Sequence, residues 1–197
     1  MLTNLNKQHF RKKEITWLAV FAIIMIPLGT YLFGTKESPF YYTLSMIGNR
    51  LGYRLNFIIW GIVTGLLLTF FIIRLFVLKS FHNQRARRLL VWSLVFLLLT
   101  VLIPTLEHLP VLKVFHVLVA IGFAVSLTLS LYLFIKHLSY NDQKAYSSSM
   151  VMFYIVVGGS LLMLFVFGMN GIFELFFFIS LSIFLGILNR KLFKKRD

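Results

Sequence analysis

The sequence predicts an all-α, polytopic membrane protein, a six-transmembrane-helix bundle with both termini in the cytoplasm. Hydrophobic residues make up 59% of the 197 residues and charged residues only 13%, whereas a soluble domain is about half apolar and about a quarter charged. The apolar residues gather in six runs, and most of the basic residues lie on one side of them. This balance excludes a disordered chain and an ordinary soluble globule, and it predicts a single membrane domain over residues 1–197.

Each of the six apolar runs approaches the roughly 20 residues that a helix needs to cross the hydrocarbon core of a bilayer. The predicted helices are Ile15–Phe33, Leu55–Leu78, Leu89–Pro104, Val114–Ile135, Met150–Phe167 and Ile172–Leu188. The first run follows Lys7, Arg11, Lys12 and Lys13, as in a signal peptide. However, no small-x-small cleavage site follows Phe33, so we expect a helix that is retained.

The basic residues predict the orientation of the bundle. Sixteen of the twenty lie on the side that holds both termini: Lys7, Arg11, Lys12, Lys13, Arg74, Lys79, Arg85, Arg87, Arg88, Lys136, Lys144, Arg190, Lys191, Lys194, Lys195 and Arg196. The other side has Lys36, Arg50, Arg54 and Lys113. The positive-inside rule assigns the first group to the cytoplasm and expects aromatic residues such as Trp17, Trp60 and Trp92 at the interfaces. The net charge of +14 is therefore a signal of topology, and we expect no nucleic-acid partner.

Small residues mark where helices come close together. Gly61 and Gly65 form a GxxxG spacing, which lets two helix backbones approach each other. Packing inside the bundle is the preferred interpretation, ahead of an interface between two copies of the chain. Oligomer partners stay open at this point.

Polar residues gather where the predicted helices meet the outer surface of the membrane. The candidate ligand-binding cluster consists of Ser45, Asn49, Asn56, Glu107, His108, His116, Asn170 and Glu174. Three interpretations compete: helix caps that pair with Arg50, Arg54 and Lys113, a binding pocket for a lipid headgroup or small amphiphile, and a catalytic or metal site. His108 and His116 are eight residues apart, which is not the i, i+4 spacing of a helical zinc site. We therefore expect no metal and no cofactor, and no residue is assigned as catalytic.

His116 is the polar residue on which the pocket interpretation depends most. It lies about one turn inside its predicted helix, where a lipid-facing orientation would be costly. His116, Ala120, Phe123, Leu127 and Ser130 follow helical spacing along one face. This face is smaller and more polar than a lipid-facing stripe, so it is predicted to turn inward.

Two stretches resemble a known family. They are Ser38-Pro39 with Tyr42–Asn49 and Phe57–Gly61, and Ile103-Pro104 with Phe115–Phe123. They are similar to the first outer loop, second helix and fourth helix of the DRAM/FRAG/Sfk-like six-helix membrane proteins, whose bacterial relatives have no known function. Met46 departs from that pattern, in which an acidic residue often follows the serine. The resemblance implies a role connected with membrane lipids and names no reaction.

The function expected from the sequence is non-enzymatic binding or sensing of a lipid or small amphiphile in the outer half of the bundle. The alternatives are a membrane component of a transporter and, after it, a membrane-embedded hydrolase that uses the His/Glu cluster. Expected partners are membrane lipids and an amphiphilic ligand. The expected location is the plasma membrane of a bacterium, since Lys, Asn, Ile and Phe are abundant.

Overall fold

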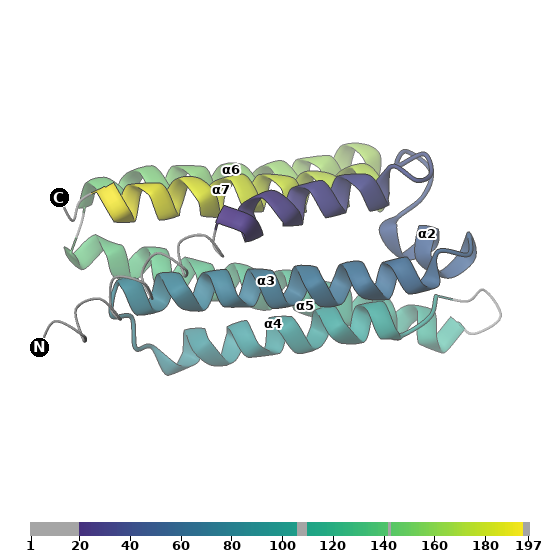
Figure 1. Cartoon of the computed structure of the whole chain (residues 1–197), viewed down its shortest axis with the longest axis horizontal. Coiled ribbons are helices and arrows are strands. Elements are labelled where there is room, and N and C mark those ends of the chain that lie inside the picture. Colours follow the sequence, from purple (N-terminus) through teal and green to yellow (C-terminus); the bar gives the residue numbers. More distant parts are fainter. Residues whose placement is uncertain (1–19, 106–109, 142, 195–197) are drawn as a thin grey trace, which may run out of the picture.

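The structure is a computed structural model that describes residues 20–105, 110–141 and 143–194. Within these ranges the chain is helical and has no strand. A helix at Val20–Gly34 comes first. It is followed by α2 (Leu44–Arg50), α3 (Arg54–Leu78), α4 (Gln84–Leu102), α5 (Pro110–Asn141), α6 (Gln143–Phe167) and α7 (Gly171–Lys194). The long helices run side by side along the longest axis, and α2 lies at one end, here called the α2 end (Figure 1).

Four of the described helices are long and apolar enough to cross a membrane: Arg54–Leu78, Pro110–Tyr140, Ala145–Phe167 and Gly171–Leu192. The prediction of an all-α membrane protein is therefore confirmed at this level. Val20–Gly34 is the described part of the first predicted run, and α4 begins five residues before the predicted Leu89. This earlier start has a local cause, because the Asn83 side chain accepts a hydrogen bond from the backbone N–H of Ala86 (3.1 Å) and caps α4.

The helix α2 was not predicted; its residues were assigned to the outer loop. Thr43 caps it, with Oγ1 accepting a hydrogen bond from the backbone N–H of Met46 (3.1 Å). Leu44, Ile47 and Gly48 are buried. A Cβ atom on Gly48 would come within 2.5 Å of the Cβ of Phe57, so α2 rests almost directly on α3. A seven-residue helix is too short to stand out by periodicity and depends on such packing.

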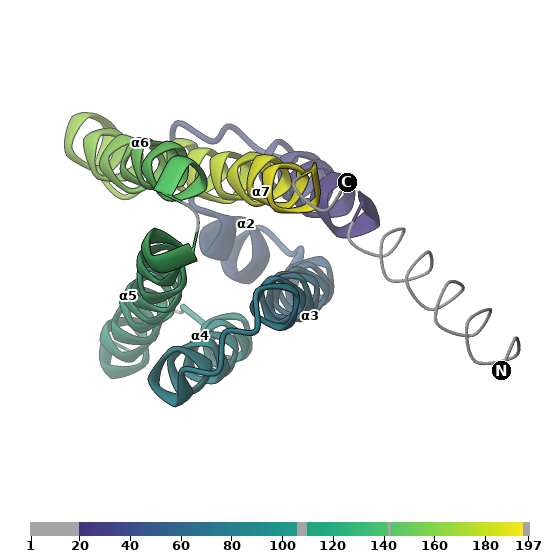
Figure 2. The same ribbon diagram turned by 90° about the vertical axis from the view of Figure 1, so that its left-hand side faces the viewer.

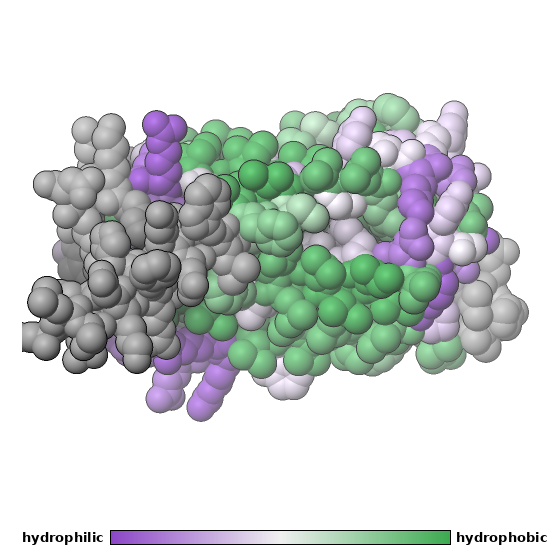
Figure 3. Space-filling model, viewed as in Figure 1, coloured by the Kyte–Doolittle hydropathy of each residue, from purple (hydrophilic) through white to green (hydrophobic). Residues whose placement is uncertain are grey.

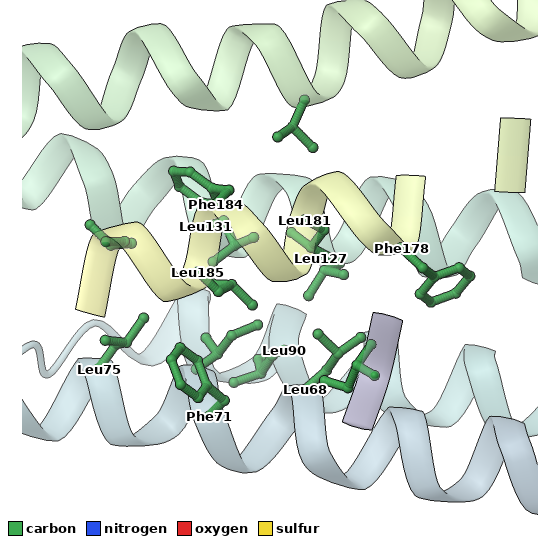
Figure 4. Close-up of a cluster of buried hydrophobic side chains, with 14 of the residues drawn as sticks. Leu68, Phe71, Leu75, Leu90, Leu127, Leu131, Phe178, Leu181, Phe184 and Leu185 are labelled. Atoms are coloured by element: carbon green, nitrogen blue, oxygen red, sulfur yellow. The ribbon is translucent and has the colours of Figure 1, made fainter. Parts of the chain in front are cut away.

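The long helices form two layers. Seen along the bundle axis, α6, α7 and the helix Val20–Gly34 form one row, and α3, α4 and α5 form the other (Figure 2). Leucine and phenylalanine side chains fill the space between the rows (Figure 4). The labelled members, all buried or nearly so, are Leu68, Phe71, Leu75, Leu90, Leu127, Leu131, Phe178, Leu181, Phe184 and Leu185.

Within the second row, α3 and α4 are joined at the GxxxG glycines. A Cβ atom on Gly61 would lie 2.2 Å from Cγ1 of Val101, and one on Gly65 would lie 2.9 Å from Leu94. Both neighbours belong to α4, so these glycines pack inside the bundle, as the sequence favoured.

The outer surface of the bundle is an apolar band with polar residues at its two ends (Figure 3). Exposed apolar side chains continue along α3, α5 and α6, including Leu66, Val125 and Phe165. A continuous apolar surface of this extent is not tolerated in water and indicates contact with lipid.

Arg74 was counted among the basic residues on the side that holds both termini, but it is not a loop residue. It lies inside α3 with only 6% of its surface exposed. Its Nη1 donates a hydrogen bond to Oδ1 of Asn189 on α7 (3.2 Å). Burial of a guanidinium among apolar helices is expensive unless it has such partners, and the link between α3 and α7 supplies one.

Candidate functional site

A cavity of about 200 Å³ lies between the two rows, toward the α2 end. Its wall includes residues from α2 to α7 and from the turn between α6 and α7. The lining residues are Leu44, Ser45, Phe57, Trp60, Leu97, Thr100, His116, Val117, Ala120, Ile121, Phe123, Ala124, Leu164, Met169, Phe173, Glu174, Phe177 and Phe178. Three residues of the predicted polar cluster, Ser45, His116 and Glu174, are thus brought together around one cavity.

The polar groups of the cavity lie toward the α2 end. On α4, Thr100 is one turn beyond Leu97. On α5, His116 comes two turns before Phe123. On α7, Glu174 comes one turn before Phe178. Apolar side chains, Phe57 and Phe173 among them, also line this end, so the cavity is mostly apolar with a few polar groups toward α2.

His116 is buried, with 5% of its surface exposed. Its Nδ1 lies 3.1 Å from the backbone carbonyl oxygen of Ile103. A carbonyl oxygen only accepts, so Nδ1 carries the proton in this contact. The inward face predicted for α5 is confirmed, since Phe123, Leu127 and Ser130 are also buried.

Glu174 lies in the first turn of α7, beneath the segment that leads into α2. The chain at Pro39 crosses the start of α7, where Ile172 donates its backbone N–H to the carbonyl of Pro39 (3.1 Å). Gly171 makes this crossing possible, because a Cβ atom there would come within 2.5 Å of the carbonyl oxygen of Tyr42. The crossing carries the backbone N–H of Leu44 to Oε2 of Glu174, 2.5 Å away.

Ser45 lies on the first turn of α2. Its Oγ is 3.0 Å from Oγ1 of Thr43, and either hydroxyl can donate in this contact. Ser45 is half-buried and faces the cavity.

Two asparagines of the predicted cluster, Asn49 and Asn170, form hydrogen bonds with other groups of the chain. Asn49 donates to Oγ1 of Thr105 (3.1 Å) and accepts from Nη1 of Arg54. Asn170 is buried and accepts a hydrogen bond from the backbone N–H of Phe173 (3.2 Å), which caps α7. Both roles match the helix-cap and pairing interpretation, and neither residue lines the cavity.

Asn56, also a member of the predicted cluster, does not join the cavity. Asn56 is exposed on the surface of α3 and does not line it. Asn56 follows Leu55 within the same helical turn, and burial of Phe57 turns it outward. Glu107 and His108 lie outside the described residues.

Trp60 and Thr100 belong to the cavity although the sequence did not assign them to it. Trp60 was expected at a membrane interface, but it is 8% exposed, and its indole N–H donates to Oγ1 of Thr30 (3.1 Å). Its ring contacts those of Phe33 and Phe57, at centroid distances of 5.9 and 5.8 Å, and these two rings also contact each other (5.8 Å). The sequence offered one signal of this burial: Trp60 lies six residues after the first residue of α3, beyond the polar residues with which that helix starts.

The wall of the cavity reaches the outer surface of the bundle at α5 and at the turn that joins α6 to α7. Ile121 and Met169 line it, yet 53% and 62% of their surfaces are exposed. Their exposed neighbours, Leu118 and Val125 on α5 and Phe165 on α6, are apolar and belong to the lipid-facing band. The wall of the cavity is therefore continuous with this band.

Among the described residues, no group of three or more His, Asp or Glu side chains comes together in a way that could hold a metal ion. No family model, no curated protein and no solved structure matches the chain.

Proposed function

We propose that this protein is a multi-pass plasma-membrane protein that binds or senses a lipid or small amphiphile in the cavity at the α2 end. The observation that carries the proposal is a mostly apolar cavity whose polar groups lie toward the α2 end and whose wall reaches the lipid-facing band. An amphiphile likewise joins a small polar group to a larger apolar part. Its polar group would lie beside Ser45, His116 and Glu174.

The size of the cavity restricts what it can hold. Its 200 Å³ is below the roughly 300–1,000 Å³ of most ligand pockets. The eight helical steps from His116 to Ala124 span about 12 Å along α5. These dimensions suit the polar group and the first part of one alkyl chain, with the rest of the ligand extending into lipid.

The proposal includes six membrane crossings with both termini in the cytoplasm. It is supported by the exposed basic residues Arg87, Arg88, Lys136 and Arg190, which lie at or near the helix ends opposite α2. The resemblance to the DRAM/FRAG/Sfk-like proteins agrees with a lipid-connected role and stays a hypothesis. In this orientation the cavity faces the outer leaflet.

Tryptophan fluorescence tests the proposal directly. Trp60 lines the cavity, whereas Trp92 is 55% exposed on α4. A variant with Trp17 and Trp92 replaced by Phe reports on Trp60 alone, and a variant with Trp17 and Trp60 replaced reports on Trp92. A brominated alcohol with a long alkyl chain should quench Trp60 saturably in lipid nanodiscs, while quenching of Trp92 should only rise in proportion to the probe in the bilayer.

A matched pair of substitutions on α5 completes the test. Ala124→Phe fills the end of the cavity away from α2 and should abolish the saturable quenching of Trp60. Val125→Phe adds the same ring on the lipid-facing side, where Val125 is 51% exposed, and should leave it unchanged. Equal, non-saturable quenching of Trp60 in all three proteins would refute binding in the cavity.

A further inference from the structure

Glu174 supplies an ionisable carboxyl group to the wall of the cavity. Among the described residues that line the cavity, it is the one with an acidic or strongly basic side chain. The backbone N–H of Leu44 donates to Oε2 of Glu174, and no Lys or Arg of the described residues forms an ion pair with it. Arg54 lies near this end of the bundle, but its guanidinium donates to Asn49 and to the carbonyl of Leu102. A buried carboxyl without a cation from the chain is either protonated or balanced by a cation that a ligand brings.

Two neutral polar groups of the cavity, Thr100 and His116, offer acceptors, whereas the hydroxyl of Ser45 can donate or accept. The hydroxyl of Thr100 already donates to the carbonyl of Phe96 (2.8 Å), which leaves its oxygen lone pairs. His116 uses Nδ1–H toward Ile103, so its neutral ring presents Nε2 as an acceptor. A group rich in N–H donors complements this set, and a carboxylate or phosphate does not.

We propose that the ligand is a cationic amphiphile whose ammonium group pairs with the carboxylate of Glu174 and whose alkyl chain lies between Phe123, Ala124 and Phe178. This inference rests on the proposed function, since it names the chemical class of the amphiphile. Pairing removes the cost of an isolated carboxylate in an apolar wall, because opposite charges that are buried together satisfy each other. Ile121 belongs both to the wall of the cavity and to the lipid-facing band, so we expect such a molecule to enter from the bilayer beside it.

The test compares three brominated probes of equal chain length, an alkylamine, an alcohol and a fatty acid, on the variant that retains Trp60 alone. Quenching of the variant that retains Trp92 alone corrects for the amount of each probe in the bilayer. We expect the amine to bind with an affinity at least about tenfold above that of the fatty acid, as a charge-assisted hydrogen bond allows.

Glu174→Gln should lower the affinity for the amine by about tenfold or more and leave the affinity for the alcohol unchanged. Glutamine keeps an acceptor for the N–H of Leu44, so retained alcohol binding also shows that the cavity is intact. Glu37→Gln, a carboxyl outside the cavity, is the matched control and should change neither affinity.

Two results would overturn the cationic ligand while leaving amphiphile binding in place: fatty-acid affinity equal to or above that of the amine, or an unchanged amine affinity in Glu174→Gln. If none of the three probes quenches Trp60 saturably, the proposed function itself fails and this inference with it.

Discussion

At the scale of single residues, the buried His116 on α5 is hydrogen-bonded to the carbonyl of Ile103, the residue that follows α4. His116→Ala should lower the free energy of unfolding by about 1–3 kcal/mol, because a half-buried carbonyl then loses its donor. The measurement is denaturant-induced unfolding in mild detergent.

His82 provides the control for this prediction. It makes the same kind of contact, from Nδ1 to the carbonyl of Ser80 (2.7 Å), but it is exposed. Water replaces that contact in His82→Ala, so the free energy of unfolding should change by less than about 0.5 kcal/mol. Equal losses in the two variants would show that burial of His116 does not set the strength of its bond.

A second prediction at this scale concerns the hydrogen bond between Arg74 and Asn189. Asn189→Leu removes an acceptor from a buried guanidinium and should cost about 1.5–3 kcal/mol of unfolding free energy. Asn56→Leu makes the same change at an exposed position of α3 and should be nearly neutral. The double variant Arg74→Met with Asn189→Leu should lose less unfolding free energy than the sum of the two single losses. In the double variant neither polar side chain is left buried without the other. Additive losses would contradict a direct interaction.

At the scale of elements, the contact between α3 and α4 depends on the absence of a side chain at Gly61. Gly61→Ala places a Cβ atom 2.2 Å from Val101, so the helices must separate. We expect a loss of about 1–3 kcal/mol in unfolding free energy, as overpacking usually costs. The same unfolding assay measures it.

Two further variants make this prediction specific. Gly158→Ala on α6 adds the same atom in open space and should not destabilise the protein. Val101→Ala in the Gly61→Ala background removes the clashing methyl groups and should recover part of the loss. No recovery would mean that Gly61 matters for a reason other than its distance from α4.

At the scale of the whole molecule, the proposed orientation is testable because the chain has no cysteine. Single cysteines at Gln143 and Lys36 are suitable, since both residues are exposed and lie at opposite ends of the bundle. In intact cells an impermeant thiol reagent should label the cysteine at Lys36 and spare the one at Gln143. Permeabilised cells should show labelling of both. The reverse labelling pattern would show that the cavity faces the cytoplasm.

The sequence by itself determined the class of the protein and the course of its long helices. Apolar runs such as Leu55–Leu78 are sufficient for this, because lipid demands that each crossing segment satisfy its own backbone hydrogen bonds. Local periodicity also determined that His116 faces inward, since a polar side chain on a face of small residues has no stable orientation toward lipid.

Only the tertiary structure decided which polar residues share a site. Glu174 and Ser45 meet because the chain at Pro39 crosses the start of α7 on Gly171, a contact between segments about 130 residues apart that no local pattern reports. Asn49 and Asn170 were indistinguishable from them in sequence, yet each is held by neighbouring chain groups. Packing between helices likewise explains the burial of Trp60, the formation of α2 and the hydrogen bond between Arg74 and Asn189. The energy of that packing depends on distances between side chains, which composition and residue spacing do not give.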